Sequence, residues 1–232
     1  MEDKYIRLTV ADGSAMLVYT SFPASESAGP AIILLPEAFG VNHHICSIAE
    51  KFAGEGYTVI SPELFHRTAP EYWEGNYEDF ESFMPHYTAV TRKGLTDDVY
   101  TCYNWLTKRY NVDRNRIFSL GYSFGGMVSF LANTFLPLKA GASFYGGGTD
   151  QLTDLAKDLH GRHLFFWAGL DKRIKDENIS PVINALDAAF KAYVNVKISY
   201  VDHGFNRDRF QNFNKAAADE AFSLTLNFFQ HS

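Results

Sequence analysis

Residues 116–126 read Arg-Ile-Phe-Ser-Leu-Gly-Tyr-Ser-Phe-Gly-Gly. The apolar run that ends at Leu120 is typical of a buried strand, and the residues after Ser123 favour a helix. Between them, Gly121 to Gly125 fit the pattern glycine-x-serine-x-glycine, in which a strained turn from strand to helix exposes a serine hydroxyl. The N-terminus of such a helix presents oriented N–H groups beside the serine. The segment therefore predicts a nucleophilic Ser123 rather than an ordinary glycine turn.

Outward from this segment, apolar strands alternate with helical patterns. At the N-terminus, residues 5–10 and 15–22 alternate around the turn Asp12-Gly13, which predicts an antiparallel hairpin. Strands then follow at 31–35, 57–61, 116–120, 140–145, 163–168 and 196–200, and helices at 45–55, 93–110, 123–133, 182–193 and 216–229. This alternation predicts an α/β fold with a mostly parallel, doubly wound sheet and helices on both faces.

One segment breaks the alternation. Residues 62–87 contain three prolines and several aromatic residues, and they are too long for a plain connector, so we expect an irregular, cap-like insertion. No repeat, linker or low-complexity tract occurs elsewhere. The sequence therefore predicts a single domain over residues 1–232.

A serine hydroxyl is a weak nucleophile and needs a neutral imidazole as base and a carboxylate to orient that base. In folds with this strand–turn–helix motif, the acid precedes the histidine, and each follows a later strand. Asp171 comes just after the strand at 163–168, and His203 just after the strand at 196–200. We expect Asp171 and His203 to fill these roles. The acids that could compete with Asp171 are Asp150, Asp154 and Asp176, whereas none of the other seven histidines lies directly after the last strand.

Composition limits the function classes. Hydrophobic residues make up 46% of the chain and charged residues 21%, as in ordinary globular proteins. The net charge of −6 argues against nucleic acid or an anionic membrane as partner. The apolar runs are too short to span a bilayer, and the charged N-terminus lacks a signal core, so we expect a cytoplasmic protein. Cys46 and Cys102 lie in helical patterns and are expected to be buried free thiols, and no ligand cluster predicts a metal.

Taken together, these residues resemble the dienelactone hydrolase family over nearly the whole chain. The most distinctive match is the segment Leu35-Pro-Glu-Ala-Phe-Gly-Val-Asn42, and the others are 121–126, 144–146, 169–171 and 203–207. The resemblance implies a compact α/β-hydrolase fold, a small ester or lactone as substrate, and no metal or organic cofactor. It also implies a monomer or a weak homo-oligomer.

The sequence departs from the best-known family members, which carry cysteine where this chain has Ser123. In those members a glutamate and an arginine, matched here by Glu37 and Arg207, help to switch the thiol to its thiolate. A serine alkoxide is far less accessible, so we do not expect the same switch. Instead we expect Glu37 and Arg207 to form a charged pair beside Ser123, where Arg207 could meet a substrate carboxylate. A purely structural ion pair is the alternative.

The remaining site residues also follow from the resemblance. The backbone N–H groups of Ala38 and Phe124 are expected to form an oxyanion hole. Tyr145 and Phe39 are expected to line the site, although aromatic residues at such positions often serve packing alone. The family has a second anion-binding arginine in the cap region, for which the candidates are Arg67 and Arg92.

The hypothesis that explains all of these features is that the protein hydrolyses carboxylic esters or lactones through an acyl-enzyme. Two alternatives stay open. A thioesterase or acyltransferase would use the same residues with a different leaving group or acceptor, and competing alcohols or thiols would reveal it by its products. A non-catalytic binding relative would need no complete set of Ser123, Asp171 and His203, and an activated ester would fail to acylate it.

Overall fold

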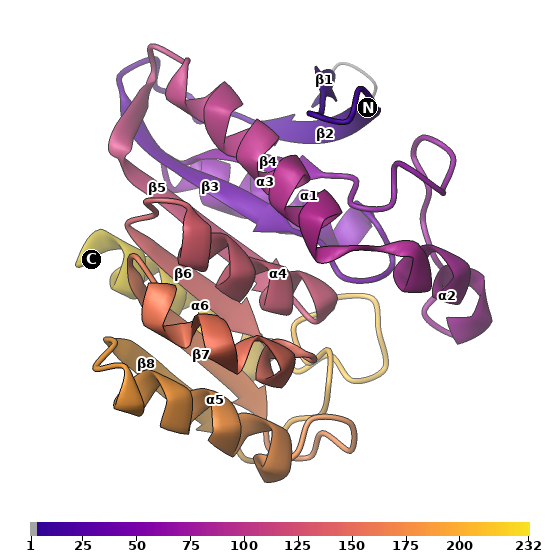
Figure 1. Ribbon diagram of the computed structural model, residues 1–232, viewed down its shortest axis with the longest axis vertical. Coiled ribbons are helices and arrows are strands. Elements are labelled where there is room, and N and C mark those ends of the chain that lie inside the picture. The colour runs from indigo at the N-terminus through magenta and orange to yellow at the C-terminus, as the bar shows by residue number, and fades with distance from the viewer. Residues whose placement is uncertain (1–3) are drawn as a thin grey trace. The chain divides into compact units, whose positions relative to one another are not determined.

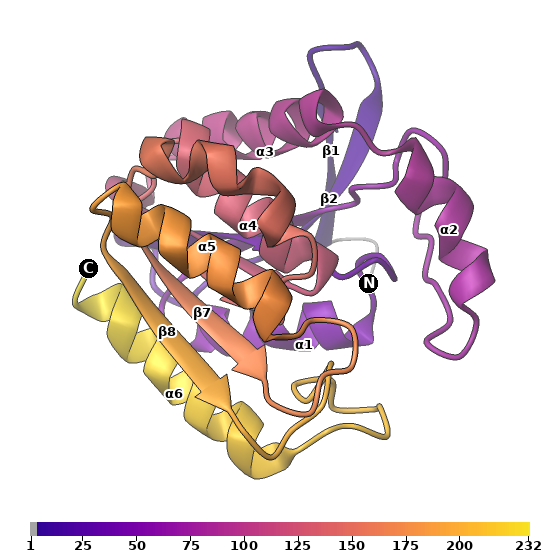
Figure 2. The ribbon, with the colours of Figure 1, turned by 60° about the horizontal axis from the view of Figure 1, so that its bottom comes forward.

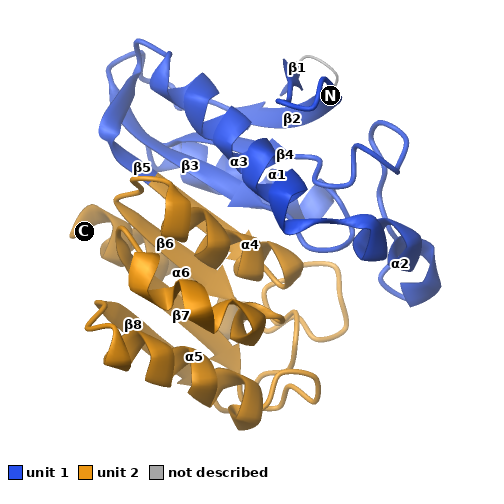
Figure 3. Cartoon of the chain, in the orientation of Figure 1, with its two compact units in different colours: residues 1–117 blue, residues 118–232 orange. Residues whose placement is uncertain are grey.

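The computed structural model describes residues 4–232. The chain, whose helices and strands are labelled in Figure 1, divides into two compact units, one that runs to Ile117 and one that begins at Phe118 (Figure 3). The boundary falls within one strand, β5, which covers Val112–Tyr122. The single domain over residues 1–232 that the sequence predicts stays a prediction.

The first unit contains the predicted antiparallel hairpin. Its strands pair with Tyr5 opposite Tyr19 and Thr9 opposite Ala15, and the strand order of the unit is β1-β2-β4-β3. Strand β3 is parallel to β4, whereas β2 is antiparallel to it. Helices α1 and α3 cover opposite faces of these strands (Figure 2). The elements are β1 (Tyr5–Thr9), β2 (Ala15–Ser21), β3 (Gly29–Leu35), α1 (His43–Gly54), β4 (Thr58–Pro62), α2 (Phe80–Ala89) and α3 (Arg92–Thr107).

The second unit carries the remaining parallel strands. Their order is β5-β6-β7-β8, and each pair of neighbours after β5 is parallel. Helices α4 and α5 lie over one face of these strands and α6 over the other (Figure 2). The elements are β5, α4 (Phe124–Phe135), β6 (Ala140–Phe144), the 3₁₀ helix η2 (Thr149–Asp158), β7 (Arg162–Ala168), α5 (Asp176–Ala188), β8 (Tyr193–Ile198) and α6 (Lys215–Gln230).

The predicted fold class is confirmed, because the described strands are mostly parallel, follow an antiparallel hairpin and alternate with helices on both faces. The bounds of several predicted elements are wrong, and the strand expected at 116–120 covers Val112–Tyr122. The helix expected at 182–193 begins at Asp176 and ends at Ala188, and the strand expected at 196–200 begins at Tyr193 and ends at Ile198. The sequence pattern also missed η2. Cys102 is a buried free thiol as predicted, whereas Cys46 is free but only partly buried.

Helix α5 ends at Ala188, before the predicted residue 193, because a C-cap motif follows it. The motif is hard to recognise in the sequence because an apolar residue occupies its central position. Phe190 adopts the left-handed conformation, with φ 54°, and its N–H donates to the carbonyl of Asp187. The next N–H, of Lys191, donates to the carbonyl of Leu186, which completes a Schellman motif. Glycine usually occupies this position, because a Cβ strains the left-handed backbone.

Replacing Phe190 by glycine is expected to stabilise the protein by about 1 kcal/mol. The Phe190 side chain is 96% exposed, so its removal costs little packing. Urea denaturation at equilibrium measures the change, and Phe190→Ala is the matched control because it removes the ring but keeps the Cβ. Equal stabilities of the glycine and alanine variants would show that the backbone strain contributes nothing.

A fully buried histidine lies among the apolar residues of β7. His163 has no exposed surface, and burial lowers the pKa of its imidazole from the usual 6.5 to about 3. The folded protein therefore holds this ring neutral over a pH range in which the unfolded chain protonates it. Between pH 6.5 and pH 3 the unfolded state binds more protons, so the contribution of His163 to stability falls as the pH falls.

The free energy of unfolding of a His163→Gln variant is expected to depend less on pH between 3 and 6.5 than that of the wild type. The difference should reach the order of 4 kcal/mol across this range, from the pKa shift of His163. Urea titrations at several pH values measure it. Glu63, whose pKa burial raises to about 7, acts in the opposite direction but cancels when the two proteins are subtracted. Parallel curves for the two proteins would contradict the prediction.

No helix among residues 4–232 is long and apolar enough to cross a membrane.

Candidate active site

Ser123 lies in the turn between β5 and α4, as the sequence predicts. Its backbone is strained, with φ 51° and ψ −115°, in a region that L-residues rarely adopt. The turn is tight enough to require glycine at its start, because a Cβ on Gly121 would lie 1.8 Å from the carbonyl oxygen of Gly125. The N–H of Ser123 donates to the carbonyl of Phe144 at the end of β6, at 2.9 Å. The neighbouring strand thus holds the strained residue in place.

Ser123, His203 and Asp171 lie in one hydrogen-bonded chain. The distance from Ser123 Oγ to His203 Nε2 is 3.0 Å, and the distance from His203 Nδ1 to Asp171 Oδ2 is 2.7 Å. With Nδ1–H donating to the carboxylate, Nε2 is left as the acceptor for the serine hydroxyl. The structure thus brings together the three residues that the sequence singled out, all within the second unit.

The Asp171 carboxylate is held ionised. Its second oxygen, Oδ1, accepts the backbone N–H groups of Arg173 and Ile174 at 2.8 and 3.1 Å. Burial acts to raise the pKa of Asp171, but the hydrogen bonds from His203 and from these two amides outweigh it and hold the pKa below its usual value. A permanently negative acceptor therefore faces the imidazole at neutral pH.

The surroundings of His203 fix its ring. The ring of Tyr145 lies 4.8 Å from the imidazole centroid to centroid, and Tyr145 is itself buried and strained at φ 39°. The backbone of His203 is held by Asp202, whose carboxylate accepts its N–H at 2.7 Å, and by Asn212, whose amide donates to its carbonyl at 2.9 Å. The His203 side chain keeps only 12% of its surface exposed. Tyr145 therefore borders this chain of residues, and its predicted role in lining the site stays a prediction.

The competing acids have other partners. Asp150 accepts a hydrogen bond from Asn178 at 3.2 Å, and Asp176 pairs with Lys197 at 2.6 Å. Asp154 lies in η2. None of the three contacts the His203 ring in the described structure, which leaves Asp171 as its carboxylate partner.

Four predicted site residues are divided between the two units. Glu37 and Ala38 lie buried just after β3 in the first unit, whereas Arg207 and Phe124 belong to the second. The Glu37–Arg207 pair and the oxyanion hole therefore stay predictions. Phe124 begins α4, so its N–H lies at the positive end of the helix dipole. The Arg207 guanidinium is buried and lies 5.0 Å from the ring of Phe210.

Two other predicted residues have identified surroundings. Phe39 makes edge-to-face contacts with the rings of Phe80 and Phe83 on α2, so it packs the insertion that follows β4. Arg67 makes two hydrogen bonds with the buried Asp98, at 2.8 and 2.9 Å, and one with Asp12, at 2.6 Å. This ion pairing argues against Arg67 as the second anion-binding arginine, and Arg92 begins α3.

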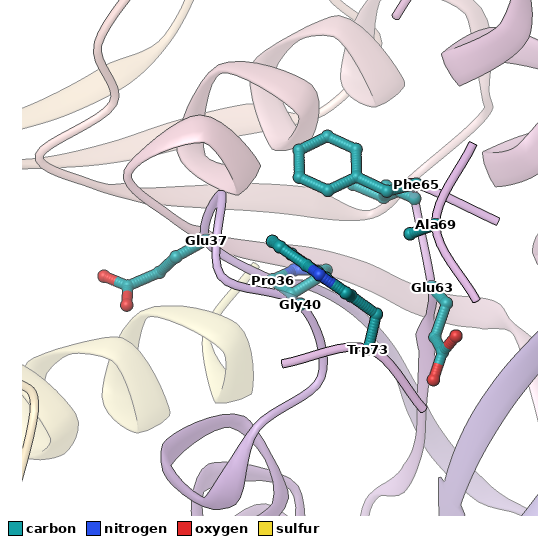
Figure 4. Close-up of a pocket in the computed structure, with 8 residues that line it drawn as sticks. Pro36, Glu37, Gly40, Glu63, Phe65, Ala69 and Trp73 are labelled. Carbon is teal, nitrogen blue, oxygen red and sulfur yellow. The ribbon is translucent and has the colours of Figure 1, made fainter. Parts of the chain in front are cut away.

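A small pocket of the first unit contains a residue that sequence reasoning missed. Glu63 is buried there, both of its carboxylate oxygens accept the N–H of Tyr72, and burial raises its pKa to about 7. The pocket has room for about one water molecule. Figure 4 shows the carboxylates of Glu37 and Glu63 on opposite sides of the Trp73 indole. The lining includes Pro36, Glu37, Gly40, Glu63, Phe65 and Trp73.

One signal in the sequence could have revealed Glu63. Strand β3 is followed by Pro36-Glu37, and strand β4 ends in Pro62 directly before Glu63. The same proline–glutamate pair thus occurs at the carboxyl ends of two adjacent parallel strands, where functional side chains tend to gather. Among residues 4–232, no group of three or more histidine, cysteine, aspartate or glutamate side chains is placed to hold a metal ion.

Comparison with known proteins places these observations in a family. A model of the dienelactone hydrolase family matches residues 16–232. A Salmonella typhi protein named "Putative carboxymethylenebutenolidase" is 30% identical over 233 residues, which cover 94% of this chain and 84% of that protein. The crystal structure of a "Putative Dienelactone Hydrolase" from Klebsiella pneumoniae is 25% identical, has a TM-score of 0.88 and covers 98% of both chains.

A second solved structure shows the same fold. It is that of a dienelactone hydrolase-like promiscuous phosphotriesterase from metagenomic libraries, with 18% identity and a TM-score of 0.84 over 98% of this chain and 97% of that one. The family model alone covers all but the first strand and turn of the described chain. The α/β-hydrolase fold and the resemblance seen in the sequence are thus confirmed, and this chain belongs to the dienelactone hydrolase family.

Proposed function

We propose that this protein hydrolyses carboxylic ester or lactone bonds of small molecules, with Ser123 as nucleophile, His203 as general base and Asp171 as the orienting acid. The observation that carries the proposal is the continuous chain from Ser123 Oγ through the His203 ring to Asp171, with distances of 3.0 and 2.7 Å. Such a chain on the strained turn after a parallel strand supplies the three roles that serine acyl transfer requires.

The reaction begins when Ser123 Oγ attacks the carbonyl carbon while its proton passes to His203 Nε2. The carbonyl electrons move onto the oxygen, and the N–H groups of Phe124 and, as proposed from the family resemblance, Ala38 stabilise the oxyanion. Asp171 stabilises the imidazolium that forms. His203 then returns the proton to the leaving alkoxide, which departs, and Ser123 is left acylated. Water, deprotonated by His203, releases the acid by the reverse sequence.

The substrate class is drawn from the relatives. The relatives carry the names "Putative carboxymethylenebutenolidase" and "Putative Dienelactone Hydrolase", and both names denote the hydrolysis of unsaturated lactones. A small lactone or ester is therefore proposed here too. Arg207 is proposed to meet a carboxylate of the substrate. The cytoplasmic location and the monomeric or weakly oligomeric state predicted from the sequence stay predictions.

A panel of short p-nitrophenyl esters and small lactones, with and without a carboxylate, tests the proposal. We expect hydrolysis of several members at pH 7 to 8, with the free acid as the product. Added alcohols and thiols separate the alternatives, because an acyltransferase would give new esters or thioesters in preference to the acid. A protein that neither turns over any member nor becomes acylated by an activated ester would be a binding relative.

A further inference from the structure

A chain of buried polar side chains leads from the core to the turn that carries Ser123. The carbonyl of Gly126 accepts the Ser143 hydroxyl at 2.6 Å, and Ser143 Oγ lies 2.8 Å from His163 Nε2. On the far side of the ring, His163 Nδ1 lies 3.2 Å from the amide nitrogen of Asn133. All of these side chains are buried. The chain therefore lies wholly within the second unit and beyond the reach of solvent.

Only one arrangement of protons satisfies this chain. Asn133 donates to the carbonyl of Gly161 and accepts its N–H, both at 2.9 Å, which fixes the orientation of the amide. Its other N–H then points at His163 Nδ1, which must be an acceptor, so the proton of the neutral ring is on Nε2. That N–H donates to Ser143 Oγ, and the single hydroxyl proton of Ser143 is left for the carbonyl of Gly126.

The chain ends in the first turn of α4. Gly126 lies three residues after Ser123, and its N–H donates to the Ser123 carbonyl at 2.9 Å. A Cβ on Gly126 would lie 2.9 Å from the Cα of Gly146, so this turn packs directly on the backbone after β6. Strand β6 thus holds the turn at two adjacent points, through the carbonyl of Phe144 to the N–H of Ser123 and through the hydroxyl of Ser143 to Gly126.

We propose that His163 and Ser143 are positioning residues for the nucleophile, which fix the first turn of α4 so that Ser123 Oγ meets His203 and the Phe124 N–H meets the oxyanion. The inference rests on the proposed function for its consequence in catalysis. His163 acts through Ser143. Its Nε2–H donates to the Ser143 oxygen, so the hydroxyl proton of Ser143 is left to be donated to the carbonyl of Gly126. Neither side chain touches the reacting atoms. Errors of about 1 Å in such a placement cost roughly 100-fold in rate.

The chain offers a matched control for Ser143. Ser119 on β5 is equally buried and also hydrogen-bonds to α4, with Ser129 Oγ at 2.8 Å and the Ser129 carbonyl at 3.2 Å. Ser129 lies further along the helix than Gly126 and away from the turn. Ser119→Ala therefore removes a comparable buried bond between strand and helix without touching the first turn.

The experiment compares Ser143→Ala, Ser119→Ala, His163→Leu and His163→Gln by ester hydrolysis and by amide hydrogen exchange. We expect Ser143→Ala and His163→Leu to lower kcat about 10- to 100-fold with little change in KM, and exchange at residues 123–127 to rise. Ser119→Ala should keep kcat within about twofold at a similar loss of stability. His163→Gln, whose amide can donate to Ser143 and accept from Asn133, should recover most of kcat.

Two outcomes overturn the inference. One is a kcat of Ser143→Ala that equals that of Ser119→Ala, and the other is unchanged exchange at residues 123–127 when the Ser143 hydroxyl is lost. The exchange measurement needs no substrate, so it decides the positioning role even if the wild type hydrolyses nothing. Absence of hydrolysis by the wild type would refute the proposed function instead. If Ser143→Ala fails to fold, the contrast between His163→Leu and His163→Gln decides alone.

Discussion

Replacing Ser123 by alanine is expected to lower kcat/KM for short p-nitrophenyl esters by about 10⁵-fold. The hydroxyl is the atom that faces His203 Nε2, at 3.0 Å. The backbone contact of this residue, from its N–H to the Phe144 carbonyl, does not involve the side chain and should persist. Steady-state kinetics together with thermal unfolding separate loss of chemistry from loss of fold.

A Ser123→Cys variant distinguishes the serine enzyme from a thiol hydrolase. If the wild type is clearly active and cysteine does not greatly raise its turnover, serine is the working nucleophile. A nearly inert wild type whose turnover is restored by cysteine would contradict that account. In that case the working nucleophile would be a thiol. Glu37 and Arg207, which match the residues that activate the thiol in other family members, would then be expected to activate it here.

Replacing Asp171 by asparagine is expected to lower kcat by about 10⁴-fold, the second largest effect. Asp171 Oδ2 accepts the His203 Nδ1–H at 2.7 Å, which leaves Nε2 free to accept the serine proton. An asparagine that presents its NH₂ there would donate to Nδ1 instead and place the proton on Nε2, so the imidazole could no longer act as base. Measurement of kcat and KM across pH checks this, with KM expected to change little.

Asp202→Asn is the matched control for this substitution. Asp202 is adjacent to His203, and its carboxylate accepts the backbone N–H of that residue rather than a ring proton. The asparagine oxygen can make the same bond, so kcat is expected to stay within a few-fold of the wild type. Equal losses in the two variants would mean that loop placement, not the tautomer of His203, controls the rate.

The features of the fold and the site that depend on local chemistry could be predicted from the sequence. Gly121 is needed by the turn itself, because a Cβ there would lie 1.8 Å from the carbonyl oxygen of Gly125, so the pattern and the geometry coincide at this position. Asp171 and His203 follow the ends of their strands, and the order of acid and base along the chain picked them from many alternatives. The family and the fold class were therefore within reach of the sequence.

The sequence failed where a residue's environment contradicts its type. Phe190 is apolar yet almost fully exposed, so the helix expected at 182–193 runs through a residue that in fact caps α5. His163 is polar yet fully buried, and its hydrogen bonds reach residues as far apart as Asn133 and Ser143. Glu63 is acidic yet buried, and its carboxylate accepts the backbone N–H of Tyr72 in the loop that follows. Such pairings arise from the tertiary fold and leave no period in the sequence.

Trapping the acyl-enzyme shows directly whether Ser123 is the nucleophile. The wild type is mixed with p-nitrophenyl acetate, quenched in acid within the first turnover, digested and analysed by mass spectrometry, with Ser123→Ala treated in parallel. We expect one acetyl group on the peptide that contains Ser123, formed at the rate of the p-nitrophenol burst and absent from the variant. Rapid hydrolysis with no acyl group on Ser123, or the same acetylation of the variant, would contradict it.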